Sequence, residues 1–531
     1  MPPVYRLAAH RPFVAQRFRS RHYHARMLSR LPALPPPALV SRVFALGVSL
    51  ALAHGTQAQA QVPTEHASRW PSALASAWQA TGLSAQSVSV WVQAVEAEQP
   101  LLAIAPDSPR RMASVMKLVT TGVALQTLGP AATWQTPIGL TGTLSPDGDL
   151  QGSVHIRASG DPSLDGMRLR EALTQWREQG LRRIRGDVVV DHSLWTLPPH
   201  DAAAFDNAPW KPYNAGASAW LVAHGAVTLR FELDGPTRPR VRLSPPMDGV
   251  TVINQLTLSD GPCGNWREGI RLEAPSDVGE RSLRLQGRYP TACLAQNWPI
   301  RWPSSTPLEH SARTWLAAWQ ALGGSLDGQV REGPWPPGQP VWSTWTSPPL
   351  HEVVRDINKF SNNVMARQLF LSLATPHGPA QPPLAGDALT VARDVAARHV
   401  RLRTQGPDGA SPCEGEHLVL DNGAGLSRTE GATARCMGHW LKALWQSPQM
   451  PEWLASLPIA GVDGTARRMT GAVGQAHLKT GSLDDVVSLA GVVHASRGQR
   501  YLVVAVVNDP KAEKARPALQ ALLQWISQDT P

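Results

Sequence analysis

A long β-rich stretch interrupts a chain of otherwise α/β texture, and this interruption constrains the fold most. From about residue 136 to 305 the sequence consists of short β-like pieces separated by Gly, Pro and Asp. Before it, residues 87–95 alternate as a strand does, and residues 112–128 are apolar and free of proline, as in a helix. After it, helical texture returns. One domain inserted into another is the simplest architecture.

We therefore expect residues 61–135 and 306–531 to form an α/β (α+β) domain and residues 136–305 to form a β-rich insert. A length of 531 residues suits two to four domains. The hydrophobic and charged fractions, 42% and 17%, are those of a globular protein rather than a disordered one. Within the second part, the texture predicts helices over 311–322, 351–374, 388–399 and 516–527, a loop over 331–350, and strands over 486–494 and 501–508.

The first 60 residues hold eight arginines and no acidic residue. Removing these eight charges from the net charge of +9 leaves +1, so the basic balance gives no reason to expect a nucleic-acid partner. An apolar run over 43–53 and the small residues of Ala58-Gln59-Ala60 follow. This pattern predicts a secretory signal cut after Ala60. The run is too short for a membrane span. A disordered basic tail beside a buried helix is the alternative, and Met27 is an alternative start.

The four cysteines, Cys263, Cys293, Cys413 and Cys436, form no C-x-x-C pair and have no zinc-site spacing with histidines. In an oxidising compartment an even number favours disulfides. Of the three pairings that four cysteines allow, we favour the local one, which joins the first two to each other and the last two to each other. Four free buried thiols are the alternative.

Lysine is rare, with seven residues against 43 arginines, so its surroundings are informative. One lysine ends the S-x-x-K sequence Ser114 to Lys117. Another begins the K-T-G sequence Lys479-Thr480-Gly481, which Ser482 follows. Between them lies one S-x-N sequence, Ser361-Asn362-Asn363. Each motif alone is weak evidence, but their occurrence together and in this order is unlikely to be accidental.

The spacing of these residues has a chemical reason. On a helix, residues three apart share a face, so Ser114 presents its hydroxyl beside the amine of Lys117. A serine hydroxyl needs a base to become a nucleophile, and lysine serves as one when burial and nearby positive charge lower its pKa. Lys479 supplies such a charge. A strand carrying K-T-G pairs with an extended peptide, and Gly481 permits close backbone approach.

The same strand suggests how a substrate is held. The hydroxyls of Thr480 and Ser482, together with Lys479, suit a substrate carboxylate. The backbone amides of Ser114 and Ser482 suit an oxyanion hole.

The three motifs resemble those of the penicillin-binding protein and serine β-lactamase superfamily. Ser361 lies 247 positions after Ser114, far more than in a plain β-lactamase. The chain is similar to the D-alanyl-D-alanine carboxypeptidase/endopeptidase family of low-molecular-mass class C. The further sequences that carry the resemblance are Gly160-Asp161-Pro162-Ser163-Leu164, Gly186-Asp187-Val188, Pro209-Trp210, Ile357 to Asn363, Gly425-Leu426-Ser427-Arg428, Leu457-Pro458 and Gly461-Val462-Asp463-Gly464-Thr465.

The resemblance implies a role for each motif residue. Ser114 is the acylated nucleophile and Lys117 its general base. Ser361 and Lys479 relay the proton, and Asn363 binds a substrate amide. Thr480, Gly481 and Ser482 hold the terminal carboxylate or the substrate strand. Cys263 and Cys293 fall where the family tends to carry a disulfide. Ala424 stands where the family usually has serine, which puts the local loop geometry in doubt.

The resemblance also implies a serine β-lactamase/transpeptidase-like fold in which the segment between the first two motifs forms one or two extra domains. It implies a periplasmic enzyme that acts on peptidoglycan peptides, uses no cofactor and no metal, and is acylated by β-lactams. It leaves a homodimer open. A β-lactamase or D-amino-acid esterase is the alternative activity, against which the large insert argues. A non-catalytic cell-wall binding module is a third reading, against which the intact motifs argue.

Two apolar features have structural explanations that we favour. The final helix carries the apolar stripe Leu519, Leu522, Leu523 and Ile526. The stripe suits a helix that covers a sheet better than one that lies peripherally on a membrane. The 20 tryptophans are expected to pack in cores more often than to stack on sugars.

Overall fold

The protein is described here by a computed structural model that covers residues 69–233, 237–273, 281–304, 306–375 and 386–528. The predicted leader, residues 1–60, lies outside the described residues. None of the helices in the described ranges is both long and apolar enough to span a membrane.

Strands from the two ends of the chain form one antiparallel sheet. Its order is β2 (Leu102–Ile104), β1 (Val88–Ala94), β22 (Arg500–Asn508), β21 (Val486–His494) and β20 (Ala476–Leu483). Strand β1 pairs with β22 from Val88↔Val507 to Ala94↔Tyr501, although more than 400 residues separate them. The predicted strands over 87–95, 486–494 and 501–508 are therefore confirmed.

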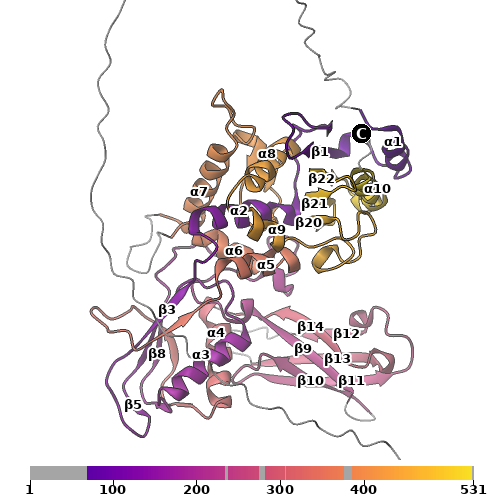
Figure 1. Ribbon diagram of the computed structural model, residues 1–531. Helices are drawn as coiled ribbons and strands as arrows, with labels where there is room; N and C mark the ends of the chain where they lie inside the picture. The colour runs from indigo at the N-terminus through magenta and orange to yellow at the C-terminus, as the bar shows by residue number, and fades with distance from the viewer. Residues whose placement is uncertain (1–68, 234–236, 274–280, 305, 376–385, 529–531) are drawn as a thin grey trace, which may run out of the picture. The chain divides into compact units, whose positions relative to one another are not determined.

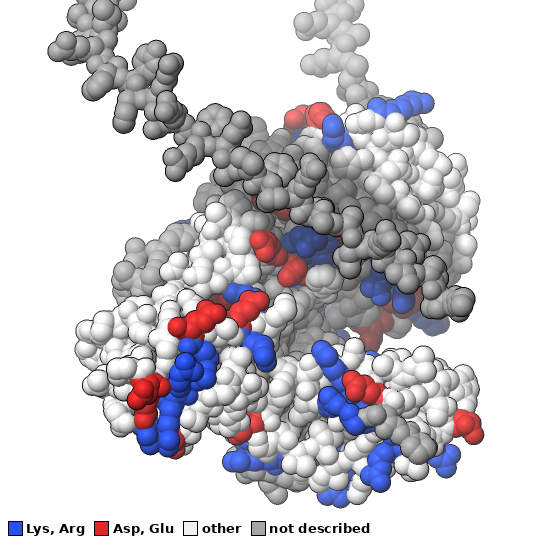
Figure 2. Space-filling model, turned by 60° about the horizontal axis from the view of Figure 1, so that its bottom comes forward, with Lys and Arg blue, Asp and Glu red and all other residues white. Residues whose placement is uncertain are grey.

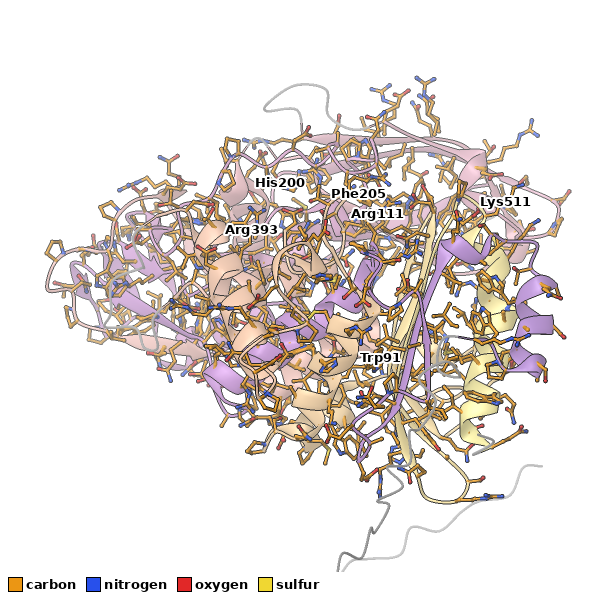
Figure 3. The ribbon with its side chains drawn as sticks, turned by 90° about the horizontal axis from the view of Figure 1, so that it is seen from above. Trp91, Arg111, His200, Phe205, Arg393 and Lys511 are labelled. Carbon is orange, nitrogen blue, oxygen red and sulfur yellow. A yellow bond between two sulfur atoms is a disulfide. The ribbon has the colours of Figure 1, made fainter. Side chains whose placement is uncertain are left out.

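Helices cover both faces of this sheet (Figures 1 and 3). On one face lie α1 (Ser72–Gln79) and α10 (Arg516–Ser527). The stripe of Leu519, Leu522, Leu523 and Ile526 packs there against alternate strand residues such as Val503 and Ala505, which confirms the expected role of the final helix. Such alternation arises because successive strand side chains point to opposite faces.

The other face of the sheet packs against a larger helical layer. Its helices are α2 (Lys117–Leu128), α5 (Leu350–Phe360), α6 (Asn363–Ser372), α7 (Ala388–Arg403), α8 (Ala434–Trp445) and α9 (Met450–Ser456). The strand residues Leu502, Val504 and Val506 belong to this second core. A 3-10 helix, Ala113–Met116, leads directly into α2. The predicted helix over 112–128 is thus present, with a tighter first turn.

The middle of the chain forms several smaller sheets. One follows the order β16 (Val330–Glu332), β8 (Val188–Asp191), β6 (Val154–Arg157), β3 (Gln135–Leu140) and β17 (Ser343–Thr346). A second contains β15 (Ser325–Leu326), β7 (Arg183–Ile184), β5 (Asp149–Gln151) and β4 (Thr143–Leu144). A third sheet has the order β10 (Pro239–Ser244), β9 (Ala226–Leu233) and β14 (Gln296–Arg301). A fourth has the order β11 (Thr251–Ser259), β13 (Ser282–Pro290) and β12 (Ile270–Glu273). Strands β15 to β17 follow residue 305 in sequence yet pair with strands that precede it.

The loop prediction for 331–350 was wrong over β17, which pairs with β3, and over the last two residues of β16, which pairs with β8. A tryptophan cluster explains why this Trp-rich segment is ordered. Trp176 of α3 (Gly166–Glu178) lies 5.1 Å, ring centroid to ring centroid, from Trp345 of β17. It also contacts Trp315 and Trp319 of α4 (Pro307–Ala321). Trp176, Trp315 and Trp319 are fully buried, as the core interpretation of the tryptophans expects.

Basic and acidic side chains lie interspersed on the face that Figure 2 shows. Ion pairs also join the strands of one smaller sheet, that of β15, β7, β5 and β4. Arg183 and Arg185 both reach Asp327, and Arg185 also pairs with Asp149.

Candidate active site

The 3-10 helix and α2 bring Ser114 and Lys117 together. Ser114 Oγ and Lys117 Nζ lie 2.9 Å apart. Ser114 is half-buried, whereas Lys117 is fully buried. Lys117 Nζ also donates to Asn363 Oδ1 and to the carbonyl oxygen of Ala424. The amine is therefore enclosed by polar partners from three separate chain segments.

Burial lowers the pKa of Lys117 well below its ordinary value of 10.5. The positive charges of Lys479 and Arg367 lower this pKa further, while the negative charge of Glu430 opposes them. A lowered pKa makes the neutral amine, which is the form that accepts a proton, more accessible than in an ordinary lysine.

Ser361 stands where two helices are separated. It ends α5 with φ +56°, in the left-handed region, and Asn362 then caps α6 by accepting from the backbone N–H groups of Val364 and Met365. The predicted helical span 351–374 is therefore two helices. This break turns Ser361 Oγ toward Lys479 Nζ, which donates to it at 2.8 Å.

Lys479 is fully buried on β20 and also donates to the carbonyl oxygen of Thr480 at 2.8 Å. Burial lowers its pKa to about 7. Two lysines with lowered pKa values thus flank the two motif serines.

Strand β20 is at the edge of the sheet, and Gly481 lies where it passes the nucleophile. A Cβ at residue 481 would be 2.3 Å from Ser488 Oγ, 2.7 Å from the carbonyl oxygen of Met112 and 3.0 Å from the backbone nitrogen of Ser114. Glycine is therefore required sterically, because no side chain fits between β20 and the start of the nucleophile helix.

Residues outside the three motifs complete the edge of the site. Thr480 Oγ1 donates to Thr465 Oγ1 at 2.7 Å, and Arg516 Nη2 donates to Ser482 Oγ at 3.0 Å. Thr465 belongs to a sequence that the family resemblance had singled out, but Arg516 carried no sequence signal. It lies at the start of α10 and approaches β20 only through the tertiary fold.

Two further charged residues, Glu430 and Arg367, were missed as well. Glu430 is 1% exposed and follows the Gly-rich segment that supplies the carbonyl of Ala424. A buried acidic residue is unusual. Its burial could not be predicted, because the sequence around Glu430 has no helical or strand periodicity that separates buried from exposed positions. Arg367 Nη1 donates to the carbonyl oxygens of Tyr213 and Ala215, which ties α6 to the middle of the chain.

Arg428, which follows Gly423-Ala424-Gly425 in the sequence, also contacts the middle of the chain. Its Cζ lies 4.5 Å from the ring centroid of Phe205, which Figure 3 labels, and its guanidinium donates to the carbonyl oxygen of Phe205.

Both local disulfides are formed. Cys263 bonds to Cys293 in the middle of the chain, and Cys413 bonds to Cys436 at the start of α8. The second bridge closes a segment that contains Ala424 and Glu430. Among the described residues, no group of three or more His, Cys, Asp or Glu side chains is arranged to hold a metal ion.

Solved structures share this fold. Penicillin binding protein 4 from Haemophilus influenzae superposes with a TM-score of 0.66 at 20% identity, over 83% of this chain and 95% of that one. A second structure of the same protein, complexed with a β-lactam, gives a TM-score of 0.64 at 19% identity, over 85% and 98%. This chain therefore shares its fold, a helix-covered antiparallel sheet with a large insert, with penicillin binding protein 4.

The family follows from the sequence comparisons. The model of the D-Ala-D-Ala carboxypeptidase 3 (S13) family matches residues 71–529, and the chain belongs to this family of peptidases. A D-alanyl-D-alanine carboxypeptidase from Actinomadura sp. (strain R39) is 28% identical over 433 residues, which cover 77% of this chain and 75% of that protein.

Proposed function

We propose that this hydrolase cleaves the terminal D-Ala from peptidoglycan stem peptides through an acyl-enzyme on Ser114, and that it also cleaves D,D-cross-links. The observation that carries the proposal is the 2.9 Å contact between Ser114 Oγ and the fully buried amine of Lys117. The family to which the chain belongs and the carboxypeptidase relative support the D-Ala-D-Ala specificity.

The contacts of Lys117 explain how it acts as a base. A neutral amine has two N–H groups and one lone pair. Asn363 Oδ1 and the carbonyl oxygen of Ala424 accept the two N–H groups. The lone pair is then left for the hydroxyl of Ser114, whose proton Lys117 takes as Oγ attacks the carbonyl carbon of the penultimate D-Ala.

The tetrahedral intermediate collapses when the leaving amine receives a proton. Ser361 and Lys479 form a hydrogen-bonded pair that can deliver it, and a pKa of about 7 lets Lys479 both hold and release a proton near neutral pH. We assign the oxyanion to the backbone amides of Ser114 and Ser482. A water molecule then attacks the acyl-enzyme. The pair of Ser361 and Lys479 takes back a proton from this water, and Lys117 returns its proton to Ser114 Oγ as the ester bond breaks.

The edge of β20 beside Ser114 is the proposed binding site for the substrate peptide. An extended peptide can add to an edge strand through main-chain hydrogen bonds. Its terminal carboxylate would meet the hydroxyls of Thr480 and Ser482, with Arg516 behind Ser482. Asn363 would bind a substrate amide.

The remaining proposals concern organisation and location. We propose that the penicillin-binding domain consists of two segments on either side of an insert, as expected for 61–135 and 306–531. The pairing of β15, β16 and β17 with β7, β8 and β3 supports a later second boundary, with an insert that continues beyond 305 to Thr346. The basic leader and the two disulfides support export, with cleavage after Ala60 and action in the periplasm. We propose at most a peripheral association with the membrane.

Fluorescent penicillin tests the mechanism. A structure of the Haemophilus influenzae protein contains a β-lactam, which supports the use of this probe. The wild type should become labelled covalently and should release D-Ala from a pentapeptide ending in D-Ala-D-Ala. Ser114→Ala should do neither. An unlabelled wild type, or equal labelling of the variant, would refute the acyl-enzyme, and rapid release of hydrolysed penicillin would favour a β-lactamase.

A further inference from the structure

Glu430 is a buried acid that satisfies three backbone amides of one short segment, the 421–425 loop. Its Oε1 accepts from the N–H groups of Asp421 at 3.2 Å and Gly423 at 3.0 Å, and its Oε2 accepts from Gly425 at 2.7 Å. Within the described ranges, no other side chain accepts a hydrogen bond from these three amides. Since an unpaired buried amide is costly, the carboxylate determines the conformation of this loop.

The 421–425 loop lies directly against the catalytic groups. A Cβ on Gly425 would be 1.8 Å from the carbonyl oxygen of Ala113 and 2.9 Å from the backbone nitrogen of Ser114. Thr120 Oγ1 of α2 donates to the carbonyl oxygen of Gly423 at 2.6 Å. The carbonyl of Ala424, between these two glycines, is the one that accepts from Lys117 Nζ. A shift of the loop therefore moves a direct partner of the base.

We propose that Glu430 is a positioning residue for the acylation step: it fixes the 421–425 loop so that Ala424 holds the amine of Lys117, and it places a compensating negative charge beside that amine. This inference rests on the proposed function, because it assigns Lys117 the role of base. It adds a residue that no catalytic motif contains and that touches neither the serine nor the substrate.

The charges around Lys117 and Glu430 support a role for Glu430 in setting the pKa of Lys117. Lys117 faces Lys479, Arg367 and Glu430, and only the last of these raises its pKa. Burial raises the pKa of Glu430, and the charge of Asp421 adds to this, while the three N–H donors oppose both. A base works best when its pKa is near the working pH. Without Glu430, burial and two cations would lower the pKa of Lys117 further and make it a weaker base.

Glu430→Gln separates this role from a purely structural one. The glutamine has no charge, and its NH₂ group cannot accept from the N–H of Gly425. We expect the rate of penicillin acylation per active site to fall by about tenfold or more. We also expect the acid limb of the pH profile of this acylation rate to move to lower pH, because the pKa of Lys117 should fall in the variant. Glu416→Gln, an exposed acid within the same disulfide-closed segment, should leave the rate and the profile unchanged.

A second readout does not depend on activity. Because the chain has seven lysines, ¹³C labelling of the lysine side chains gives a spectrum in which Lys117 can be assigned by its loss in Lys117→Met. Titration should show a lower pKa of Lys117 in Glu430→Gln than in the wild type. An unshifted lysine pKa together with an unchanged rate per active site would overturn the proposal. Absence of wild-type labelling would instead refute the proposed function, and the titration would still test the effect of Glu430.

Glu430→Asp decides the question if the glutamine variant does not fold. The shorter side chain keeps the charge but cannot reach all three amides. We expect an acid limb at the wild-type position and a lower rate per active site, counted by saturating penicillin labelling. A wild-type rate in folded Glu430→Asp would contradict the proposal.

Discussion

Lys359 Nζ lies 2.6 Å from Asp463 Oδ2, and this ion pair joins the end of α5 to the loop that carries Thr465. Lys359 is 6% exposed and stands two residues before Ser361. Asp463 Oδ1 also accepts from the backbone N–H of Ile459. The pair thus links the position of Ser361 to the Thr465 hydroxyl that supports Thr480.

Breaking this pair should impair catalysis. Lys359→Met is expected to lower the rate of penicillin acylation by about tenfold, because small displacements of Ser361 are costly. Asp463→Asn should have a similar effect, and the double variant should lose less than the sum of the two losses. Stopped-flow labelling measures the rates. Fully additive losses would show that the two residues act independently.

The ion pair of Lys359 and Asp463 should also make the free energy of unfolding fall at acid pH. Burial raises the pKa of Asp463, but the hydrogen bonds from Lys359 and Ile459 outweigh it and leave the pKa lowered. A lowered pKa in the folded state stabilises the protein above the unfolded-state value and loses that effect as the pH falls through the folded value. Thermal unfolding in the acid range should therefore be less steep with pH in Asp463→Asn than in the wild type.

Lys479 is expected to reduce stability in return for activity. Burial lowers its pKa to about 7, so between about 7 and its ordinary value of 10.5 the unfolded chain binds more protons than the folded one. Lys479→Met should abolish labelling yet stabilise the protein by about 2 kcal/mol. The gain should be largest below pH 7 and shrink toward pH 10. Thermal melts across this range test the prediction, and a less stable variant would contradict it.

Gly481→Ala should inactivate the enzyme without unfolding it globally. The new Cβ would meet Ser488 Oγ and two backbone atoms beside the nucleophile, so β20 must move away from Ser114. We expect labelling to slow by roughly 100-fold. Gly166→Ala, at the start of α3, is the matched control, because its nearest neighbour would be the Cβ of Pro245 at 3.3 Å. Equal labelling of the two variants would show that β20 does not need this close approach.

Arg516 should affect substrate binding more than turnover. Its guanidinium reaches Ser482 at the position proposed for the substrate carboxylate. Arg516→Met is expected to raise KM for a peptide with a free terminal carboxylate by about tenfold, with a smaller change in kcat. The effect should be weaker on a peptide amidated at that end. Lys514→Met, an exposed cation two residues away, serves as the control.

The two disulfides should differ in their effect on activity. Replacing Cys413 and Cys436 by alanine frees the segment that contains the 421–425 loop, so both stability, by about 3 kcal/mol, and labelling should fall. Replacing Cys263 and Cys293 should destabilise the middle of the chain but leave the rate of labelling per active site unchanged. A loss of labelling in the second variant would show that the two regions are tightly coupled.

Local patterns were sufficient for the strands and helices that pack on the main sheet, because their apolar periodicity reflects burial. They failed for β17, where proline-rich and tryptophan-rich residues are ordered by distant aromatic partners. Ser361 illustrates a similar limit: the helical pattern runs through it, yet the chain breaks there to turn its hydroxyl toward Lys479.

The motif spacing predicted that the three motifs meet in one site. In the structure Lys117 lies within hydrogen-bonding distance of Ser114 and Asn363, and Lys479 lies within hydrogen-bonding distance of Ser361. Glu430 and Arg516 were not foreseen. Both act through contacts made by the tertiary fold, with partners that no sequence periodicity relates to them.

The pairing of β1 with β22 has a consequence for how the enzyme is made. The central strand of the main sheet is β22 (Arg500–Asn508), which is synthesised more than 400 residues after its neighbour β1. Lys117 meets Asn363 across 246 positions, and Lys479 meets Ser361 across 118. A partly synthesised chain therefore has its serine without its base environment or substrate strand. The site is complete only when residues 476–508 have joined the strand and helix formed near residues 88–128.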